Sequence, residues 1–126
     1  MEAIKRLGTE EIQISDIALA KLQAKADNGD LLVEFGYPKV PDGSSPQSRM
    51  GRYSHIDKTN VCAKITKVHR GEDGAVYGTV MPLGPKSKIL KQLMRSGNDG
   101  KVTFGVRALS GIGQQPEIVT FDLIKF

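Results

Sequence analysis

Apolar and polar residues alternate in two stretches of the second half of the chain, which predicts two β-strands. The strands are expected at Ala75 to Leu83 and at Lys101 to Leu109. The segment between them predicts a helix from Pro85 to Arg95, because its apolar residues recur at helical spacing and so share one buried face. These apolar residues are Ile89, Leu90, Leu93 and Met94. We expect the strand, the helix and the second strand to follow one another with few residues between them.

The same reasoning predicts the remaining elements. A helix is expected from about Asp16 to Ala26, capped by Ser15 or Asp16, with its inward face formed by Ile17, Ala20 and Leu22. Glycines at both ends of the segment 71–74 predict a hairpin turn. The other expected strands are Ala3 to Leu7 (a short edge strand), Leu31 to Phe35, Thr59 to His69 and Ile118 to Ile124, the last pairing with Lys101 to Leu109.

These elements predict an α+β fold, a small and mostly antiparallel β-barrel or sheet of about six strands with two helices. At 126 residues the chain is expected to form a single domain, residues 1–126. The stretch from Pro38 to Tyr53 shows no apolar periodicity, so we expect a loop there. Arg49 and Arg52 are its notable side chains, and a basic loop can either close over an anionic group or be a plain insertion.

Charge is spread unevenly along the chain. Eighteen Lys and Arg against fourteen Asp and Glu leave a net charge of +4, yet six basic residues and only one acid, Asp99, lie between Lys86 and Arg107. Lys88, Lys91 and Arg95 follow one another at steps of three and four, which places them along one side of the expected helix. This stripe is either a contact surface for an anionic partner or an ordinary solvated face.

Few residues are suited to catalysis or to metal binding. His55 and His69 lack metal-ligand spacing, and the single Cys62 excludes an internal disulfide and any multi-cysteine metal site. We therefore expect no cofactor and no metal. With no signal peptide and no apolar run long enough to span a bilayer, a reducing cytoplasm is expected. No aromatic pattern typical of sequence-specific nucleic-acid recognition is present.

The order of five sequence blocks resembles that of the bacteriophage prohead (head-maturation) proteases, which are relatives of the herpesvirus assembly proteases. In that family a Gly-Glu-Leu-x-His-Pro block supplies a histidine, and a Val-Ser-Ser-Arg-Gly-Leu-Gly strand supplies the nucleophilic serine. The resemblance covers about residues 30 to 125. The blocks that carry it are Leu31 to Pro38, Ile56-Asp57 with Cys62-Ala63, Ala75 to Val80, Gly84 to Leu93 and Gly105 to Gly111.

The resemblance also implies departures that bear on function. Tyr37 stands where the family has its histidine, and Gly105 and Val106 stand where it has the serine pair. Glycine and valine cannot attack a carbonyl, and a phenol with a reference pKa of about 10 is a poor base at neutral pH. No catalytic residue is then expected. A groove for an extended peptide or a small anionic ligand would remain, lined by Glu34, Tyr37, Arg107 and Ser110.

Arg107 lies within an expected strand and needs an anionic partner, either Glu34 or a ligand. The leading hypothesis is a phage-encoded, non-catalytic protein that binds a protein partner, from phage or host, or a small anionic ligand. It would serve capsid assembly or inhibit a host defence system in the cytoplasm of the infected cell. The alternatives are an active head-maturation serine protease using Ser110 and His55, and a decoration protein on the virion. A homo-oligomer formed through an exposed strand edge is also compatible with the pattern.

Overall fold

The computed structural model describes residues 2–8, 14–95, 102–109 and 117–125. Its elements confirm the predicted α+β fold, with six strands and with three α-helices instead of two. The strands are β1 (Ala3–Leu7), β2 (Leu32–Glu34), β3 (Val61–Arg70), β4 (Val76–Pro82), β5 (Thr103–Leu109) and β6 (Glu117–Lys125). The helices are α1 (Asp16–Asp27), α2 (Pro46–Ser54) and α3 (Ser87–Arg95), and a 3₁₀ turn covers Lys58–Asn60.

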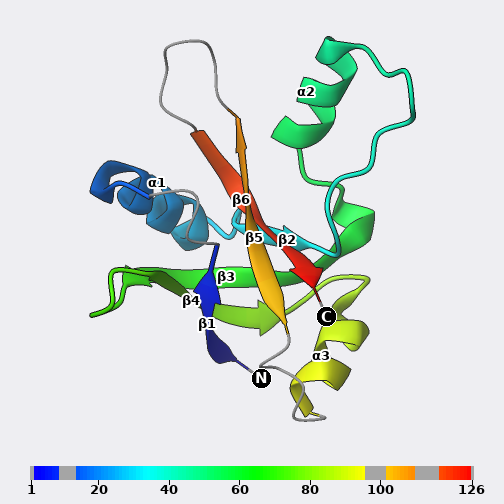
Figure 1. The fold of residues 1–126 in the computed structure, drawn as a ribbon. Coiled ribbons are helices and arrows are strands. Elements are labelled where there is room, and N and C mark those ends of the chain that lie inside the picture. The colour runs from blue at the N-terminus through cyan, green and yellow to red at the C-terminus, as the bar shows by residue number, and fades with distance from the viewer. Residues whose placement is uncertain (1, 9–13, 96–101, 110–116, 126) are drawn as a thin grey trace.

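The six strands form one sheet in the order β2-β3-β4-β1-β5-β6 (Figure 1). The predicted β3–β4 hairpin and the antiparallel β5–β6 pair are both confirmed. The prediction that Ala3–Leu7 is an edge strand is wrong, because β1 lies inside the sheet. It pairs antiparallel with β4 along its length and parallel with β5 at Leu7 and Phe104.

The two ends of the sheet meet, so the sheet is nearly closed into a barrel. Phe35 forms a bridge with Leu123, and the Gly36 N–H donates to the Leu123 carbonyl at 2.7 Å. Farther along β6, the Lys25 ammonium donates to the carbonyls of Ile118 and Val119. These contacts occupy acceptors on β6 that an added strand would need, so this part of the edge is not free to pair with a peptide.

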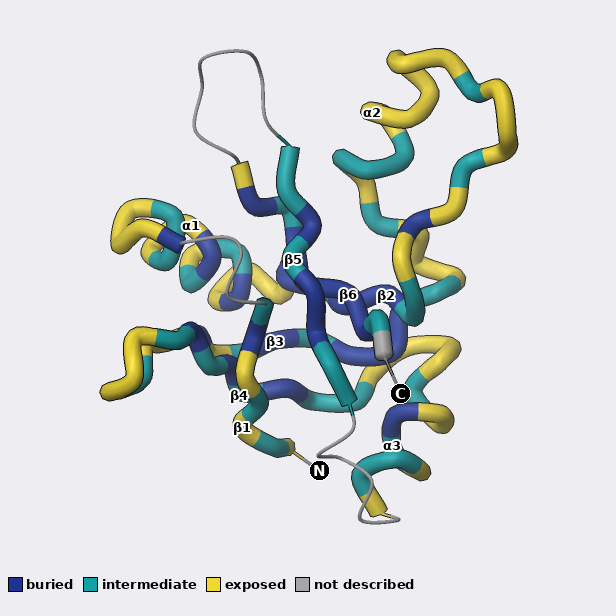
Figure 2. The backbone as a smooth tube through the Cα atoms, in the orientation of Figure 1, coloured by how far each residue is buried: buried dark blue, intermediate teal, exposed yellow. Residues whose placement is uncertain are grey.

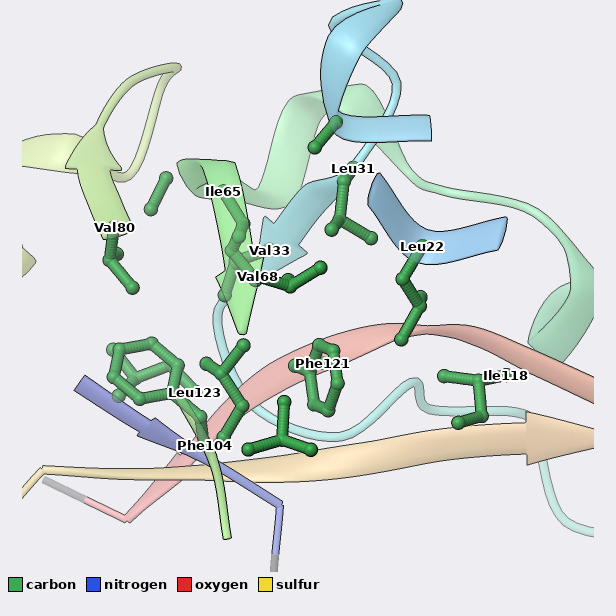
Figure 3. Packing of buried hydrophobic residues seen from close by; sticks show 14 of the residues in the cluster. Leu22, Leu31, Val33, Ile65, Val68, Val80, Phe104, Ile118, Phe121 and Leu123 are labelled. Carbon is green, nitrogen blue, oxygen red and sulfur yellow. The ribbon is translucent and has the colours of Figure 1, made fainter. Parts of the chain in front are cut away.

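The barrel encloses an apolar core. Its largest fully buried apolar side chains come mainly from the strands, with one each from α1 and α3, and they pack against one another (Figure 3). They include Phe104, Phe121, Leu123, Val33, Ile65 and Leu22. No helix in the described part of the chain is long and apolar enough to cross a bilayer.

Helix α1 begins as predicted, since the Ser15 hydroxyl accepts a hydrogen bond from the Ala18 N–H. Its expected inward face is only partly correct. Leu22 is buried, but Ile17 is 73% exposed and Ala20 is also exposed. The helix packs through residues four apart, Ala18, Leu22 and Ala26, and this row points away from Ile17.

Helix α3 confirms the predicted element, and it covers one end of the barrel at β3 and β4 (Figure 1). Leu90 is buried and Met94 packs against the core. Ile89 was expected on the buried face but is 36% exposed, because Leu90 and Met94, four residues apart, form the contact row.

The prediction of a loop from Pro38 to Tyr53 is wrong in its second half, where α2 forms. The Ser45 hydroxyl accepts from the Ser48 N–H, and Pro46 occupies the first turn, where its missing N–H costs nothing. None of the residues of α2 is buried (Figure 2). The spacing of apolar residues does not predict such a helix, because none of its sides is buried against the core.

Candidate functional site

A cluster of four charged side chains lies on β2, α2, β5 and β6. The Arg107 guanidinium stands at its centre and donates to the Asp122 carboxylate at 2.6 and 2.9 Å. It also donates to the Glu34 carboxylate at 2.7 Å. The Arg52 guanidinium reaches Glu34 from the outside at 2.7 and 3.2 Å. Two cations and two anions make the cluster neutral, and we call it the ion cluster.

Strand register explains how Arg107 and Asp122 meet. Arg107 is opposite Thr120 and Gly105 is opposite Asp122, so Arg107 and Asp122 are diagonal neighbours on one face of the β5–β6 pair. The pair between them, Val106 and Phe121, points to the opposite face and into the apolar core. The ion cluster and the apolar core therefore occupy opposite faces of the same two strands.

Glu34 reaches the cluster from β2. The pairing register shifts between Val33 and Glu34, and both side chains are fully buried. Such a bulge lets two consecutive residues point away from solvent. With an exposed fraction of 0%, Glu34 is a buried carboxylate and not a solvent-side residue of the strand.

The Glu34 carboxylate accepts hydrogen bonds from four residues. Besides the two arginines, the Asp57 N–H donates at 3.2 Å and the Asn60 side-chain amide at 3.3 Å. Burial alone would raise the pKa of Glu34, but these donors stabilise the ionised form and lower its pKa to about 2. For Asp122 burial has the larger effect and raises the pKa, although Arg107 opposes it.

The low pKa of Glu34 predicts how this group responds to acid. Because its folded-state pKa lies below the ordinary value of 4.5, its contribution to stability is complete above about pH 4.5 and is lost as pH falls toward 2. In a carboxyl ¹³C NMR titration, the Glu34 signal should stay at its ionised position down to about pH 3. A titration midpoint at pH 4 or above would show that the arginines do not stabilise the ionised form of Glu34.

The other predicted site residues are more scattered. Tyr37 is 59% exposed and Arg49 donates to the Ser44 carbonyl from the exposed side of α2. Ser110 lies outside the described residues. On α3, the basic stripe is present as expected, with Lys88 and Arg95 exposed and Lys91 half-buried. Of the four residues expected to line the groove, the structure brings together Glu34 and Arg107, and these two form an ion pair with each other.

Sequence reasoning missed one member of the ion cluster, Asp122, and two residues that donate hydrogen bonds to Glu34, Asp57 and Asn60. Asp122 carries a signal in retrospect, since a carboxylate within the apolar strand Ile118 to Ile124 requires a cationic partner. Its pairing with Arg107 depends on strand register, which no local pattern specifies. Asp57 and Asn60 lie at the two ends of the 3₁₀ turn, where Asp57 is the N-cap and its carboxylate accepts a hydrogen bond from the Thr59 N–H.

A family model covers most of the chain. The model of the Peptidase S80 family, which is the phage prohead protease family, matches residues 11–125. The chain belongs to the Peptidase S80 family. No curated protein and no solved structure gives a significant match. The resemblance drawn from the order of sequence blocks is thereby confirmed at the level of the family.

The positions that the resemblance aligns with the serine pair of S80 proteases are tightly packed in this member. A Cβ atom added at Gly105 would lie 2.6 Å from Cδ1 of Ile124, which is closer than real side-chain contacts. Val106 packs against the core. A serine at position 105 would therefore require Ile124 to move.

One serine and one histidine of this S80 chain do approach each other. The Ser54 hydroxyl lies 3.0 Å from Nδ1 of His55, but the same Nδ1 lies 2.9 Å from the Gly51 carbonyl. A carbonyl only accepts, so a hydrogen bond from Nδ1 to the Gly51 carbonyl requires the tautomer with its proton on Nδ1, and in that tautomer Nδ1 cannot take a proton from Ser54. Ser54 itself donates to the Gly51 carbonyl at 3.2 Å. The pair thus closes the end of α2 and lacks the arrangement of a nucleophile with its base.

Cys62 is fully buried on β3. Burial raises the pKa of its thiol to about 12, so the reactive thiolate is essentially absent at neutral pH. Ellman's reagent should label it at pH 8 only as fast as the protein unfolds, and labelling should become rapid in denaturant. Fast labelling of the native protein would contradict this assignment.

Proposed function

We propose that this member of the Peptidase S80 family is non-catalytic and acts by binding a protein partner in the phage-infected cell. The observation that carries the proposal is that glycine and valine, which have no nucleophilic group, stand at positions 105 and 106, where the family resemblance would place the serine pair. A side chain at position 105 would also require the Cδ1 end of Ile124 to move. The neutral ion cluster supports it as well. Arg107 and Glu34 already satisfy each other, so neither is free to assist cleavage of a peptide.

The partner-binding surface that we propose is the exposed side of α3. The segment from Leu83 to Arg95 contains four basic residues and no acid. Leu83 is 39% and Ile89 36% exposed, so apolar area lies among the charges. A basic surface with apolar side chains in it fits an acidic protein surface that also offers some apolar contact. We call this surface the α3 basic face.

The test compares two variants with the same change in charge. Lys88→Glu with Lys91→Glu reverses two charges on the α3 basic face, whereas Lys58→Glu with Lys67→Glu reverses two exposed charges elsewhere. Each protein is used to capture binding partners from infected cells, and bound proteins and small molecules are identified by mass spectrometry. A specific partner should be retained by wild type and by the control pair and lost from the α3 pair.

With the captured partner purified, the α3 pair should weaken affinity about tenfold or more, and wild-type affinity should fall as salt is raised. The folded state of each variant is checked by circular dichroism. Equal affinity of all three proteins across a salt series would contradict a role for the α3 basic face. Retention on virions instead of on a soluble partner would favour the decoration protein.

A further inference from the structure

The two arginines of the ion cluster are held very differently. The Arg107 side chain is 5% exposed and comes from the middle of β5. The Arg52 side chain is 23% exposed and comes from α2, which contributes no buried residue and stands out from the barrel (Figures 1 and 2). A helix of nine residues has little stability of its own in water. The contact of Arg52 with Glu34 is therefore one attachment of α2 to the barrel, beside the hydrogen bond that Arg107 donates to the carbonyl of the C-cap residue His55 at 3.0 Å.

Glu34 does not depend on α2 for its position. Its Oε2 atom accepts from Arg107 and from the Asp57 N–H, and its Oε1 atom accepts from the Asn60 amide as well as from Arg52. Without Arg52, three donors still orient the carboxylate, and the fourth position opens toward solvent. Two carboxylates would then face Arg107 alone, which leaves a net charge of −1 in the cluster. A replacement cation is favoured at that position.

We propose that the position of the Arg52 guanidinium beside Glu34 is an exchangeable guanidinium site. In the resting molecule α2 fills it, and an arginine side chain of a bound polypeptide takes it over when α2 moves away. The chemistry selects guanidinium over ammonium, because Arg52 contacts both carboxylate oxygens with two nitrogens and a planar group reproduces this geometry. The exchange replaces the ion pair of Arg52 with Glu34 by an equivalent ion pair of the incoming arginine with Glu34. Its free-energy cost is chiefly that the incoming arginine, unlike Arg52, is not covalently attached to the protein.

This site is distinct from the α3 basic face, and the inference goes beyond the proposed function. It is tested by chemical rescue. Arg52→Gly vacates the site, and methylguanidinium is titrated into the purified variant while the thermal midpoint and the backbone amide signal of Asp57 are followed. Binding should be saturable in the millimolar range. The midpoint should rise by roughly 5 °C at ten times the dissociation constant.

Two controls separate occupation of the site from general salt effects. Arg49→Gly removes an arginine of the same helix that contacts only the Ser44 carbonyl, and it should show no saturable response. Methylammonium at equal concentration should rescue Arg52→Gly at least threefold less than methylguanidinium. Equal responses of Arg52→Gly, Arg49→Gly and wild type, or the absence of saturation in Arg52→Gly, would overturn the proposal.

The wild-type protein offers a second measurement. A peptide with one central arginine should accelerate hydrogen exchange of the α2 amides while leaving those of α3 unchanged, and the same peptide with lysine should do so less. If Arg52→Gly does not fold, the titration is made on Arg52→Gln. Failure of both variants to fold would show that Arg52 is a fixed structural residue, which overturns the exchange.

Discussion

Arg107→Ala is expected to lower the free energy of unfolding by about 3–5 kcal/mol, the largest loss for any member of the ion cluster. The substitution leaves Asp122 fully buried without the cation that contacts both of its oxygens, and it leaves Glu34 with the partly exposed Arg52 as its remaining cation. Uncompensated buried charge is among the costliest defects in a folded protein. Urea denaturation followed by circular dichroism measures the loss, at low temperature if the variant is only marginally stable.

Arg52→Ala is the matched comparison. It removes the outer guanidinium from the same carboxylate, but that side chain is partly exposed and Glu34 keeps three other donors. Its cost should be less than half that of Arg107→Ala. Similar losses for the two variants would mean that both arginines are equally structural, and a loss below about 1 kcal/mol for Arg107→Ala would contradict the central role of Arg107.

Gly84→Ala is expected to destabilise the protein by about 2–4 kcal/mol, for two reasons that act together. Gly84 has a φ of +91°, which side chains rarely adopt, and a Cβ there would lie 2.7 Å from the backbone oxygen of Val61. That oxygen accepts from the Lys86 N–H at the start of α3, so the clash also disturbs the attachment of the helix. The loss is measured by urea denaturation.

Gly43→Ala separates the two reasons. Gly43 has a φ of +80°, but no atom lies within 4 Å of the added Cβ. It therefore carries the backbone strain without the clash, and its cost should be about 1 kcal/mol. Equal effects of the two substitutions would show that contact with Val61 contributes nothing to the attachment of α3.

Elements specified by local pattern were predictable from the sequence. The β3–β4 hairpin follows from alternating strands around a glycine-bearing turn, and α3 follows from its helical spacing. The position of β1 was not predictable, because five residues with weak alternation do not reveal that both edges are paired. Helix α2 was missed since it has no buried face, and its signal lies in the Ser45 cap and Pro46.

The candidate site was predictable in part for the same reason. A charged residue within each of two apolar strands identified Glu34 and Arg107, and one of the two partners considered for Arg107 was Glu34. The contribution of Asp122 depends on the register of β6 against β5. The contribution of Arg52 depends on α2, a helix that the pattern of apolar residues does not predict. The parts of the site that were not predicted from the sequence therefore depend on contacts between residues far apart in the chain.

The most direct test of the non-catalytic proposal is labelling with a serine-reactive fluorophosphonate, read by intact-protein mass spectrometry. The account predicts no covalent adduct on the native protein, and no change in this result for Ser110→Ala or His55→Ala. A stoichiometric adduct on wild type that disappears in both variants would contradict it and would establish an active serine protease.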